Sequence, residues 1–529
     1  MLLKYLTGKN EDIPAGSSAI FFGFSSIFWF VVGTGLGSFN AAKLAFPDFV
    51  TGTELFAFGH MRQVHVLAVI LGWISMAFAM TMMYMTPALG NTKLWSEKLG
   101  LWTGMMWNIG LSLALLSLWI GITSGREYSD FAWPLDLVIL LGVITPLCVN
   151  VIMTIAHRRT QGIYITNWFF GSCTFMVGIV LLVGNSPEYF HLTGLSEAYL
   201  TWWNAHNLLG LWITPVAAAI AYYTIPKLTG NPLYSHRIGH LHFWSIIVFY
   251  STPASHHIMS SPIPEWLKSF ASVEGVLILI PAVAFVANIL LTMKGKWSMF
   301  VENIETKFSM TGVLLAVPLN MQGGFQQTRA INWYIHGTGW IVAHAHLALL
   351  GMSTFLEIAA VYFGLQQMLK RKVYSLALAN IHYWFVLIGF CIYWISMTIA
   401  GLIQGAGHGR ARLCGVVHAA DALQGLVVEA LHADGQARDA GGSKGLETLA
   451  LKGAGVGLQC DLGAWRQRQA RADVGQQAVD ACGRKQAGRA AADEHAVHAA
   501  APDQRQRGLQ VGAQGVEVAR LGQLARALV

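Results

Sequence analysis

Apolar runs of about 20 residues recur along the chain as far as about residue 404, and each run is long enough to cross the hydrocarbon core of a membrane as a helix. The 529 residues are 54% hydrophobic and only 12% charged, which is about half the charge of a soluble domain. These runs indicate one fold class: an all-α, polytopic bundle of helices embedded in a lipid bilayer.

We expect eleven transmembrane helices, near residues 17–40, 57–86, 99–123, 134–156, 166–185, 199–226, 238–260, 266–293, 308–325, 338–366 and 378–404. Because the connections are short, helices that follow one another in sequence should be neighbours in a single bundle, residues 17–404. Residues 1–16 should form a cytoplasmic segment without a cleavable signal peptide, since the first apolar run is long enough to remain in the membrane.

The basic residues predict the orientation of the bundle, because loops rich in lysine and arginine stay in the cytoplasm. With the N-terminus inside, the cytoplasmic loops hold most of these residues: Lys93, Lys98, Arg158, Arg159, Lys227, Arg237, Lys294, Lys296, Lys370, Arg371 and Lys372. The opposite loops hold only scattered ones. We therefore expect a multi-pass protein of the bacterial inner membrane with a cytoplasmic N-terminus.

The composition changes at about Gly405. From there to Val529 the sequence has no Ile, Phe, Tyr, Met or Asn and no run that could cross a membrane. Residues 405–529 are then either a disordered extension or a translation artefact such as a frameshift, and the odd number of helices before them favours the artefact. We exclude this tail from the functional argument.

Cysteine and charge exclude several kinds of site. The six cysteines are scattered and form no CxxC pair, so a thiolate metal site and a disulfide framework are not expected. The net charge of +7 lies in the tail and in short loops, and nothing in the sequence indicates nucleic-acid binding.

Histidines gather at one depth of the predicted bundle. His65 lies in the first turns of the second helix, His206 two turns into the sixth, and His256–His257 at the end of the seventh, while His344 and His346 lie in the tenth. All of these positions fall in the outer third of the bilayer. A single buried histidine is more often a hydrogen-bonded core residue, but several at a common depth favour metal ligation.

Ligation by imidazole alone suits haem iron and copper. His256 and His257 can converge on one ion and, with His206, would make a three-histidine copper site. Because His344 and His346 are two residues apart, they point about 200° apart on a helix and must serve different centres. One of them can hold a haem beside the copper, and the other can share a second haem with His65.

Four polar residues near the same rim could bind haem propionates: Arg62, Arg329, Asn332 and His336. An equally fair interpretation is that they are solvated loop residues.

The pattern resembles the catalytic subunit of haem–copper oxidases, and most closely subunit I of the cbb3 type, over about Phe58 to Gln404. The resemblance rests on several motifs: Gly-His-Met-Arg-Gln-Val-His65, His206-Asn-Leu-Leu-Gly, Tyr222-Tyr-Thr-Ile-Pro-Lys227, His242-Phe-Trp, Tyr250 before His256-His257, His344-Ala-His346 and Gly401-Leu-Ile-Gln404.

The resemblance implies a role for each histidine. His65 and His346 would ligate a low-spin haem b, and His344 a high-spin b-type haem. His206, His256 and His257 would hold copper B. Tyr250 would be the redox-active tyrosine that the family cross-links to the copper ligand corresponding to His206, and we expect Tyr250 and His257 to lie two turns apart on one helix.

The implied function is a proton-translocating terminal oxidase that reduces O2 to water with electrons from cytochrome c. Membrane-anchored c-type cytochrome subunits would be partners, because no CxxCH motif is present. Protons would enter from the cytoplasm past Tyr223, Thr224 and Ser245, although hydroxyl groups in membrane helices often only bond a backbone carbonyl.

The chain departs from the family pattern at two places. Gln322 stands where the cbb3-type enzymes have a glutamate, and a glutamine cannot titrate. The last helix of the family's twelve is missing.

Two other functions compete with the oxidase. A nitric oxide reductase would have glutamates after His206 and no tyrosine at position 250. A transporter would have an acidic residue near the midplane and discontinuous helices.

Overall fold

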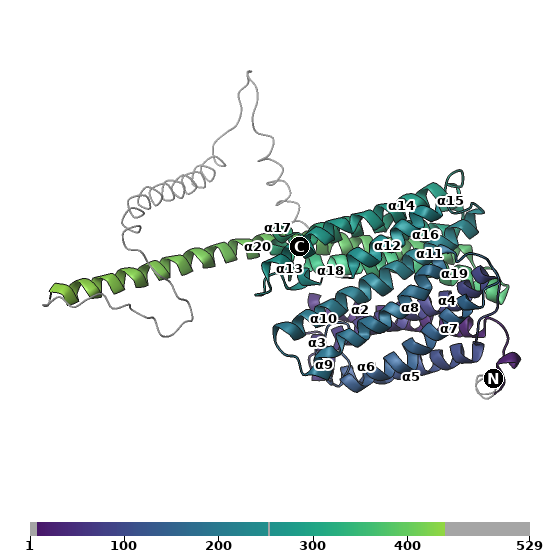
Figure 1. Cartoon of the computed structure of the whole chain (residues 1–529), viewed down its shortest axis with the longest axis horizontal. Helices are drawn as coiled ribbons and strands as arrows, with labels where there is room; N and C mark the ends of the chain where they lie inside the picture. The colour runs from purple at the N-terminus through teal and green to yellow at the C-terminus, as the bar shows by residue number, and fades with distance from the viewer. Residues whose placement is uncertain (1–7, 252–253, 440–529) are drawn as a thin grey trace, which may run out of the picture. The chain divides into compact units, whose positions relative to one another are not determined.

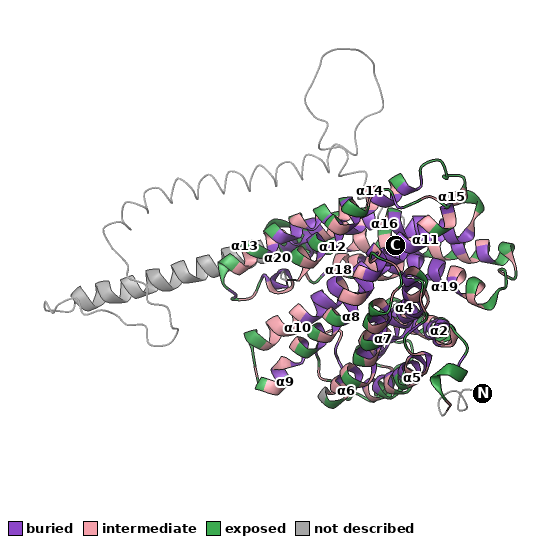
Figure 2. Ribbon diagram, turned by 45° about the vertical axis from the view of Figure 1, so that its right-hand side comes forward, coloured by how far each residue is buried: buried purple, intermediate pink, exposed green. Residues whose placement is uncertain are grey.

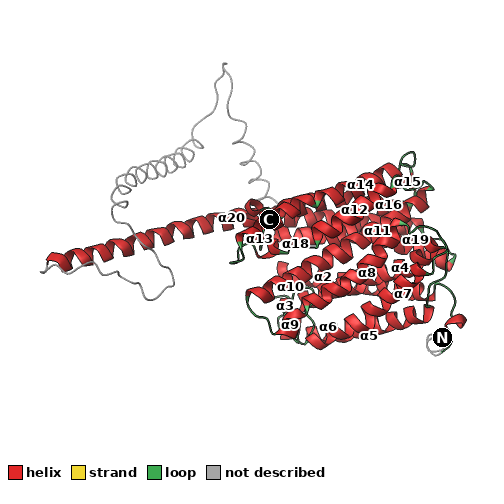
Figure 3. Cartoon of the chain, viewed as in Figure 1, coloured by secondary structure: helices red, strands yellow, loops and turns green. Residues whose placement is uncertain are grey.

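A computed structural model of the chain describes residues 8–251 and 254–439. This part of the chain is almost entirely helical and contains no strand (Figure 3). The chain divides into two compact units, Met1–Glu429 and Ala430–Val529. The helical bundle belongs to the first unit, and residues 440–529 of the expected tail lie outside the described residues.

Helices occupy all eleven expected positions (Figure 1). In chain order they are α2 (Ser17–Ala45), α3 to α4 (Phe58–Gly90), α5 (Glu97–Trp119), α6 to α7 (Trp133–Ala156), α8 (Ile165–Gly184), α10 to α11 (Leu195–Thr229), α12 (His236–Tyr250), α13 to α14 (Glu265–Thr292), α16 (Ile304–Gln326), α18 to α19 (Gly339–Leu369) and α20 (Leu376–Asp439).

Nine helices in the described part of the chain are long and apolar enough to cross a membrane. The two expected spans that do not qualify are α12, which has only 15 residues, and α16, which is long enough but less apolar. The most buried spans, Phe58–Gly90, Leu195–Thr229 and Gly339–Leu369, form the middle of the bundle, where buried residues dominate the ribbon (Figure 2).

The seventh expected span is shorter than the sequence suggested. Helix α12 ends at Tyr250, and His256 and His257 lie on a separate 3₁₀ turn, η6 (Ser255–Ile258). The expectation that Tyr250 and His257 share one helix is therefore wrong. Pro253 stands between them in the sequence, and a proline cannot donate the hydrogen bond that would continue a helix.

The last helix crosses the expected boundary at residue 404. Helix α20 continues to Asp439, and its segment Leu376–Gly407 could cross a membrane. Only a small share of that segment is buried against the bundle.

Polar caps begin several helices where short loops enter the bundle. The side chains of Ser96, Ser235 and Asn303 accept hydrogen bonds from the backbone N–H groups of the first turns of α5, α12 and α16. These bonds satisfy donors that have no partner within a helix. Gly230 ends α11 with a positive φ of 71°, which glycine adopts without strain.

Four of the long spans change to π-helical geometry partway along. The π segments are η3 (Ala68–Ile74), η4 (Leu140–Ile144), η5 (Leu209–Ile213) and η7 (Leu347–Ser353). Three of them begin one to three residues after His65, His206 or His346. Such segments are rare and are frequent at functional sites, so they mark the depth at which the candidate ligands lie.

Candidate metal centre

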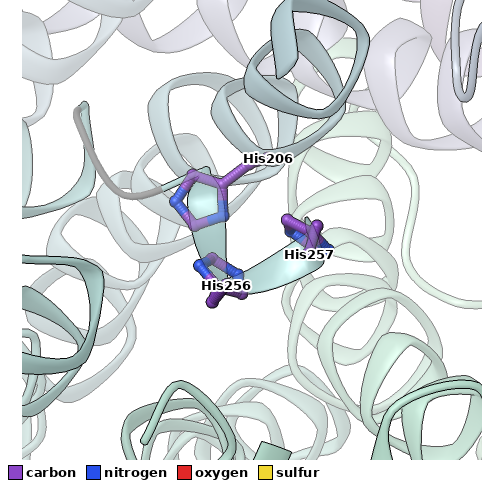
Figure 4. Close-up of side chains that lie close together, drawn as sticks. All are labelled: His206, His256 and His257. Carbon is purple, nitrogen blue, oxygen red and sulfur yellow. The ribbon is translucent and has the colours of Figure 1, made fainter. Parts of the chain in front are cut away.

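Three histidines from two segments converge inside the bundle (Figure 4). His206 projects from α10, and His256 and His257 project from η6. One nitrogen from each ring lies within 4.8 Å of the others. The ring centroids are 4.7 Å apart for His206 and His256 and 4.1 Å apart for His256 and His257. This arrangement brings together the three residues that the sequence assigned to one copper ion.

The donor set fits a metal. Nε2 of His206 is buried and has no hydrogen-bond partner among the described residues. A buried polar atom without a partner destabilises the fold, and coordination would satisfy it. Imidazole ligands without thiolates or carboxylates suit copper.

Neighbouring side chains hold the two histidines of η6 in place. The side-chain amide of Asn332 donates to the backbone carbonyls of His256, at 3.0 Å, and of Gln326, at 3.1 Å. The indole of Trp202 stacks on His257 with a centroid distance of 4.7 Å and an interplanar angle of 10°. These contacts tie the turn to α16 and α10.

Tyr250 lies against the same cluster. Its ring stacks on His206 with a centroid distance of 4.4 Å and an interplanar angle of 22°. Gly210, one turn after His206, makes this approach possible, because a Cβ atom at position 210 would lie 1.6 Å from Cδ1 of Tyr250. This glycine ends the motif His206-Asn-Leu-Leu-Gly, but the motif alone does not indicate its role.

His65 and His346 form a second pair. Their rings are nearly parallel, with an interplanar angle of 15° and centroids 6.4 Å apart. Nitrogens bind transition metals at about 2 Å, so two imidazoles on opposite sides of one metal have ring centres roughly 6 Å apart. The pair therefore fits the two axial positions of a six-coordinate haem.

Backbone hydrogen bonds select the ring nitrogens that would remain free to bind a haem iron. Nδ1 of His65 donates to the carbonyl of Gly33 at 2.8 Å, and Nδ1 of His346 donates to the carbonyl of Val342 at 2.9 Å. A carbonyl only accepts, so Nδ1 of each ring carries the proton and Nε2 is left for iron. Gly37 leaves space for the ring of His65, since a Cβ there would lie 2.7 Å from its Cε1.

His344 lies away from that pair, as its two-residue offset from His346 predicts. His346 faces His65 and Tyr393, whereas the ring of His344 approaches Gly323 of α16. Nδ1 of His344 is buried and has no hydrogen-bond partner among the described residues. The arrangement leaves His344 available to a different centre from the one that His346 serves.

The expected propionate residues already have protein partners. Arg62 forms an ion pair with Glu127 in the loop after α5. Arg329, which is exposed, bonds Glu265 at 2.6 Å and also donates to Ser269. His336 follows α17 (Arg329–Ile335) and also has a contact of its own. Their binding to propionates stays a prediction. The two carboxylate partners, Glu127 and Glu265, could not be recognised from the sequence.

The loop that holds Glu127 also holds a buried carboxyl group, Asp130. It accepts a hydrogen bond from Gln63 at 3.2 Å. Burial, followed by the nearby charge of Glu127, raises the pKa of Asp130 to about 7. This loop residue was not recognised from the sequence.

The expected proton-path residues divide into two kinds. The hydroxyls of Thr224 and Ser245 donate to the carbonyls of Ile220 and Leu241 on their own helices. Tyr223 instead packs against Tyr84 of α4, with ring centroids 6.3 Å apart. Their roles in proton transfer stay predictions.

Two other polar residues, Tyr222 and His242, are linked to Tyr250 through a shared cavity. The hydroxyl of Tyr222 and Nδ1 of His242 are 3.1 Å apart. His242 and Tyr250 border a small cavity that Thr214 and Asn320 also line. The sequence placed Tyr222 and His242 in motifs but did not identify this cavity.

Gln322 lies on α16 and precedes Gly323, the residue that the ring of His344 approaches. Its buried Oε1 has no hydrogen-bond partner among the described residues.

Comparison with known proteins gives one consistent result. The family described as cytochrome c and quinol oxidase polypeptide I matches residues 17–420. The cbb3-type cytochrome c oxidase subunit CcoN1 of Stutzerimonas stutzeri is 31% identical over 392 residues, which cover 73% of this chain and 82% of the relative. A cytochrome c oxidase subunit 1 homologue of Agrobacterium tumefaciens is 28% identical and covers 72% of each chain.

The fold has a solved counterpart as well. A haem–copper terminal oxidase dimer determined by cryo-electron microscopy superimposes with a TM-score of 0.61 at 15% identity, over 74% of each chain. With a family match over most of its length, this chain belongs to the haem–copper oxidase subunit I family of cytochrome c and quinol oxidases.

Proposed function

We propose that this chain is the catalytic subunit of a cbb3-like terminal oxidase, which reduces O2 to water with electrons from cytochrome c and couples the reaction to proton translocation. Membership of the family makes the chain an oxidoreductase of the respiratory oxidases. The observation that carries the proposal is the three-histidine cluster with Tyr250 stacked on His206.

We assign the cofactors to the histidines as follows. His65 and His346 would hold a low-spin haem b, His344 a high-spin b-type haem, and His206, His256 and His257 copper B. When bound, these groups supply the O2-binding position and most of the electrons that four-electron reduction requires.

The chain's own side chains would then manage protons at this centre. Tyr250 borders both the cluster and the small cavity, so its hydroxyl can give up a proton together with an electron. His242 lines the same cavity and interacts with the hydroxyl of Tyr222, which lets this pair hold a proton beside Tyr250. The hydrophobic packing around the cluster would exclude bulk water.

The wider assignments follow from the same proposal. Membrane-anchored c-type cytochrome subunits would deliver the electrons. The complex would lie in the bacterial inner membrane with the N-terminus of this chain in the cytoplasm. A nitric oxide reductase is not favoured, because the named relatives are cytochrome c oxidase subunits.

The test is cofactor analysis of the purified complex, with a reduced-minus-oxidised absorbance spectrum and turnover of O2 and of NO. We expect about one copper per two b-type haems and consumption of O2. His256→Ala should remove the copper, whereas His157→Ala, at an exposed histidine, should not. Non-haem iron in place of copper, together with NO turnover alone, would overturn the proposal.

A further inference from the structure

Glu357 is a buried acid without a partner in the middle of α19 (Thr354–Leu369). Its side chain has no exposed surface, and neither carboxyl oxygen has a hydrogen-bond partner among the described residues. The other buried carboxyl groups in this part of the chain all have partners: Glu97, Asp130, Asp136, Glu274 and Glu305.

An acid in this setting is neutral. A carboxylate that has lost its water shell and gained neither a cation nor a hydrogen-bond donor is strongly disfavoured, so the group keeps its proton. Ionisable residues inside membrane spans are expensive and usually functional. No motif in the sequence singles out this residue.

The face of α19 that carries Glu357 packs against α4 and the η3 segment that leads into it. Thr354, three residues earlier, accepts a hydrogen bond from the indole of Trp73 of η3 at 2.9 Å. Gly364, seven residues later, approaches Met80 of α4, whose Cε would lie 3.3 Å from a Cβ at that glycine. Residues at these spacings share one helix face, so Glu357 lies between the two contacts, where α19 faces the junction of η3 and α4.

These two helices continue into the segments that carry His346 and His65. Glu357 is eleven residues after His346 on one continuous helical span, Gly339–Leu369, which corresponds to about 16 Å along the axis. The acid is therefore buried on the cytoplasmic side of the candidate haem pair, in the orientation proposed above.

Titratable groups from neighbouring helices lie further along towards the cytoplasmic end. Phe363 of α19, about 9 Å beyond Glu357 along the axis, contacts the rings of Tyr84 of α4 and Tyr223 of α11. The ammonium group of Lys227 lies 5.8 Å above the ring of Tyr223. Glu305 of α16 is bonded to Gln366, nine residues after Glu357.

We propose that Glu357 is a proton-carrying residue of this oxidase, held as a neutral acid between the cytoplasmic phase and the metal centres. It loses one proton towards the centres and regains one from the cytoplasmic phase. Only the O–H bond of the carboxyl group breaks and forms again, and no electron passes through the residue. The direction of transfer rests on the proposed oxidase function, whereas the neutral state of the acid does not.

Infrared spectroscopy of the intact complex tests the neutral state. We expect a carbonyl stretching band of a protonated carboxyl group that moves to lower frequency in D2O and is missing in Glu357→Gln. Glu97→Gln is the matched control, because Glu97 is also buried but accepts a hydrogen bond from Ser18. Glu357→Asp should restore a shifted band. A spectrum that is the same in Glu357→Gln and in the unaltered complex would overturn the neutral acid.

Proton uptake from the cytoplasmic side tests the transfer. Glu357→Gln should slow uptake and O2 turnover by at least about tenfold while haem and copper contents stay unchanged. Uptake at the original rate in this variant would overturn the role. A complex without copper or haem would instead contradict the proposed oxidase function and leave the infrared result standing.

Discussion

The imidazole rings of His65 and His346 face each other nearly in parallel, 6.4 Å between centroids, while each Nδ1 is bonded to a backbone carbonyl. The two rings come from helices far apart in the sequence, yet they are positioned as a matched pair. His346→Ala should therefore remove the low-spin haem and reduce O2 turnover more than about 100-fold.

The measurement is the haem-to-protein ratio together with the spectrum of the reduced complex. Copper should stay bound, because His346 is not part of the three-histidine cluster. His157→Ala, at an exposed histidine, is the control. Retention of both haems in His346→Ala would contradict the assignment.

Asn332 should control how tightly copper is held. Asn332→Ala removes the bonds that tie His256 to α16, and loss of such supporting bonds typically weakens metal binding by about 10–100-fold. Asn231→Ala is a close control, because Asn231 also donates to two carbonyls, of Thr292 and Lys294, away from the cluster. Copper retention during dialysis against a chelator compares the two. Equal retention would show that Asn332 does not position the site.

Gly210→Ala should displace Tyr250. The added Cβ cannot fit at 1.6 Å from the ring, so either Tyr250 or the η5 segment that carries Gly210 has to move. Overpacking of this kind costs about 1–3 kcal/mol of folding stability, and O2 turnover should fall as Tyr250 leaves His206. Gly110→Ala, where a Cβ meets no other atom within 4 Å, should be neutral or slightly stabilising. Thermal unfolding and turnover of both variants check this, and normal turnover in Gly210→Ala would refute it.

Asp130 should make stability depend on pH. Its pKa is about 7 in the folded protein, because of burial and Glu127, and 3.8 in an unfolded reference. Between these values the folded protein binds more protons than the unfolded chain, so the free energy of unfolding falls as pH rises from about 4 to about 7. Asp130→Asn should remove this dependence and be more stable than the unaltered protein at pH above about 7.

Thermal unfolding of the complex across this pH range is the measurement. Asp48→Asn, at an exposed residue, is the control and should keep the original pH dependence. A steeper loss of stability with pH in Asp130→Asn than in the unaltered protein would contradict the prediction.

The membrane architecture could be predicted because the bilayer requires a long apolar run for each helix. The depth of the histidines followed from the same pattern, since position along a span gives height in the membrane. The three histidines assigned to one ion, His206, His256 and His257, lie close together in the structure, and their binding of copper stays a prediction. The prediction failed for the helix that should have joined Tyr250 to His257, because periodicity does not show where a helix ends and a turn begins.

Contacts between distant segments could not be predicted from spacing. Arg62 was expected to be available for a propionate, but it is paired with Glu127, which lies in another loop. The exclusion of every side chain at Gly210 depends on how closely η5 packs against α12, which no local pattern specifies. Glu357 could have been noticed as a lone acid in an apolar helix, but only packing reveals that it has no partner.

The π-helical segments after His65, His206 and His346 have a consequence for how this chain can change. Each contains an extra residue within the turn, so the segment uses one residue more than a regular helix to cover nearly the same rotation. Deleting one residue there can be absorbed by a return to regular α-helical geometry, which keeps both halves of the span facing their present neighbours. A deletion in a regular part of the same span cannot be absorbed in this way and would turn everything beyond it by about 100°. Single-residue deletions should therefore damage the protein less within these three segments than elsewhere in the same spans.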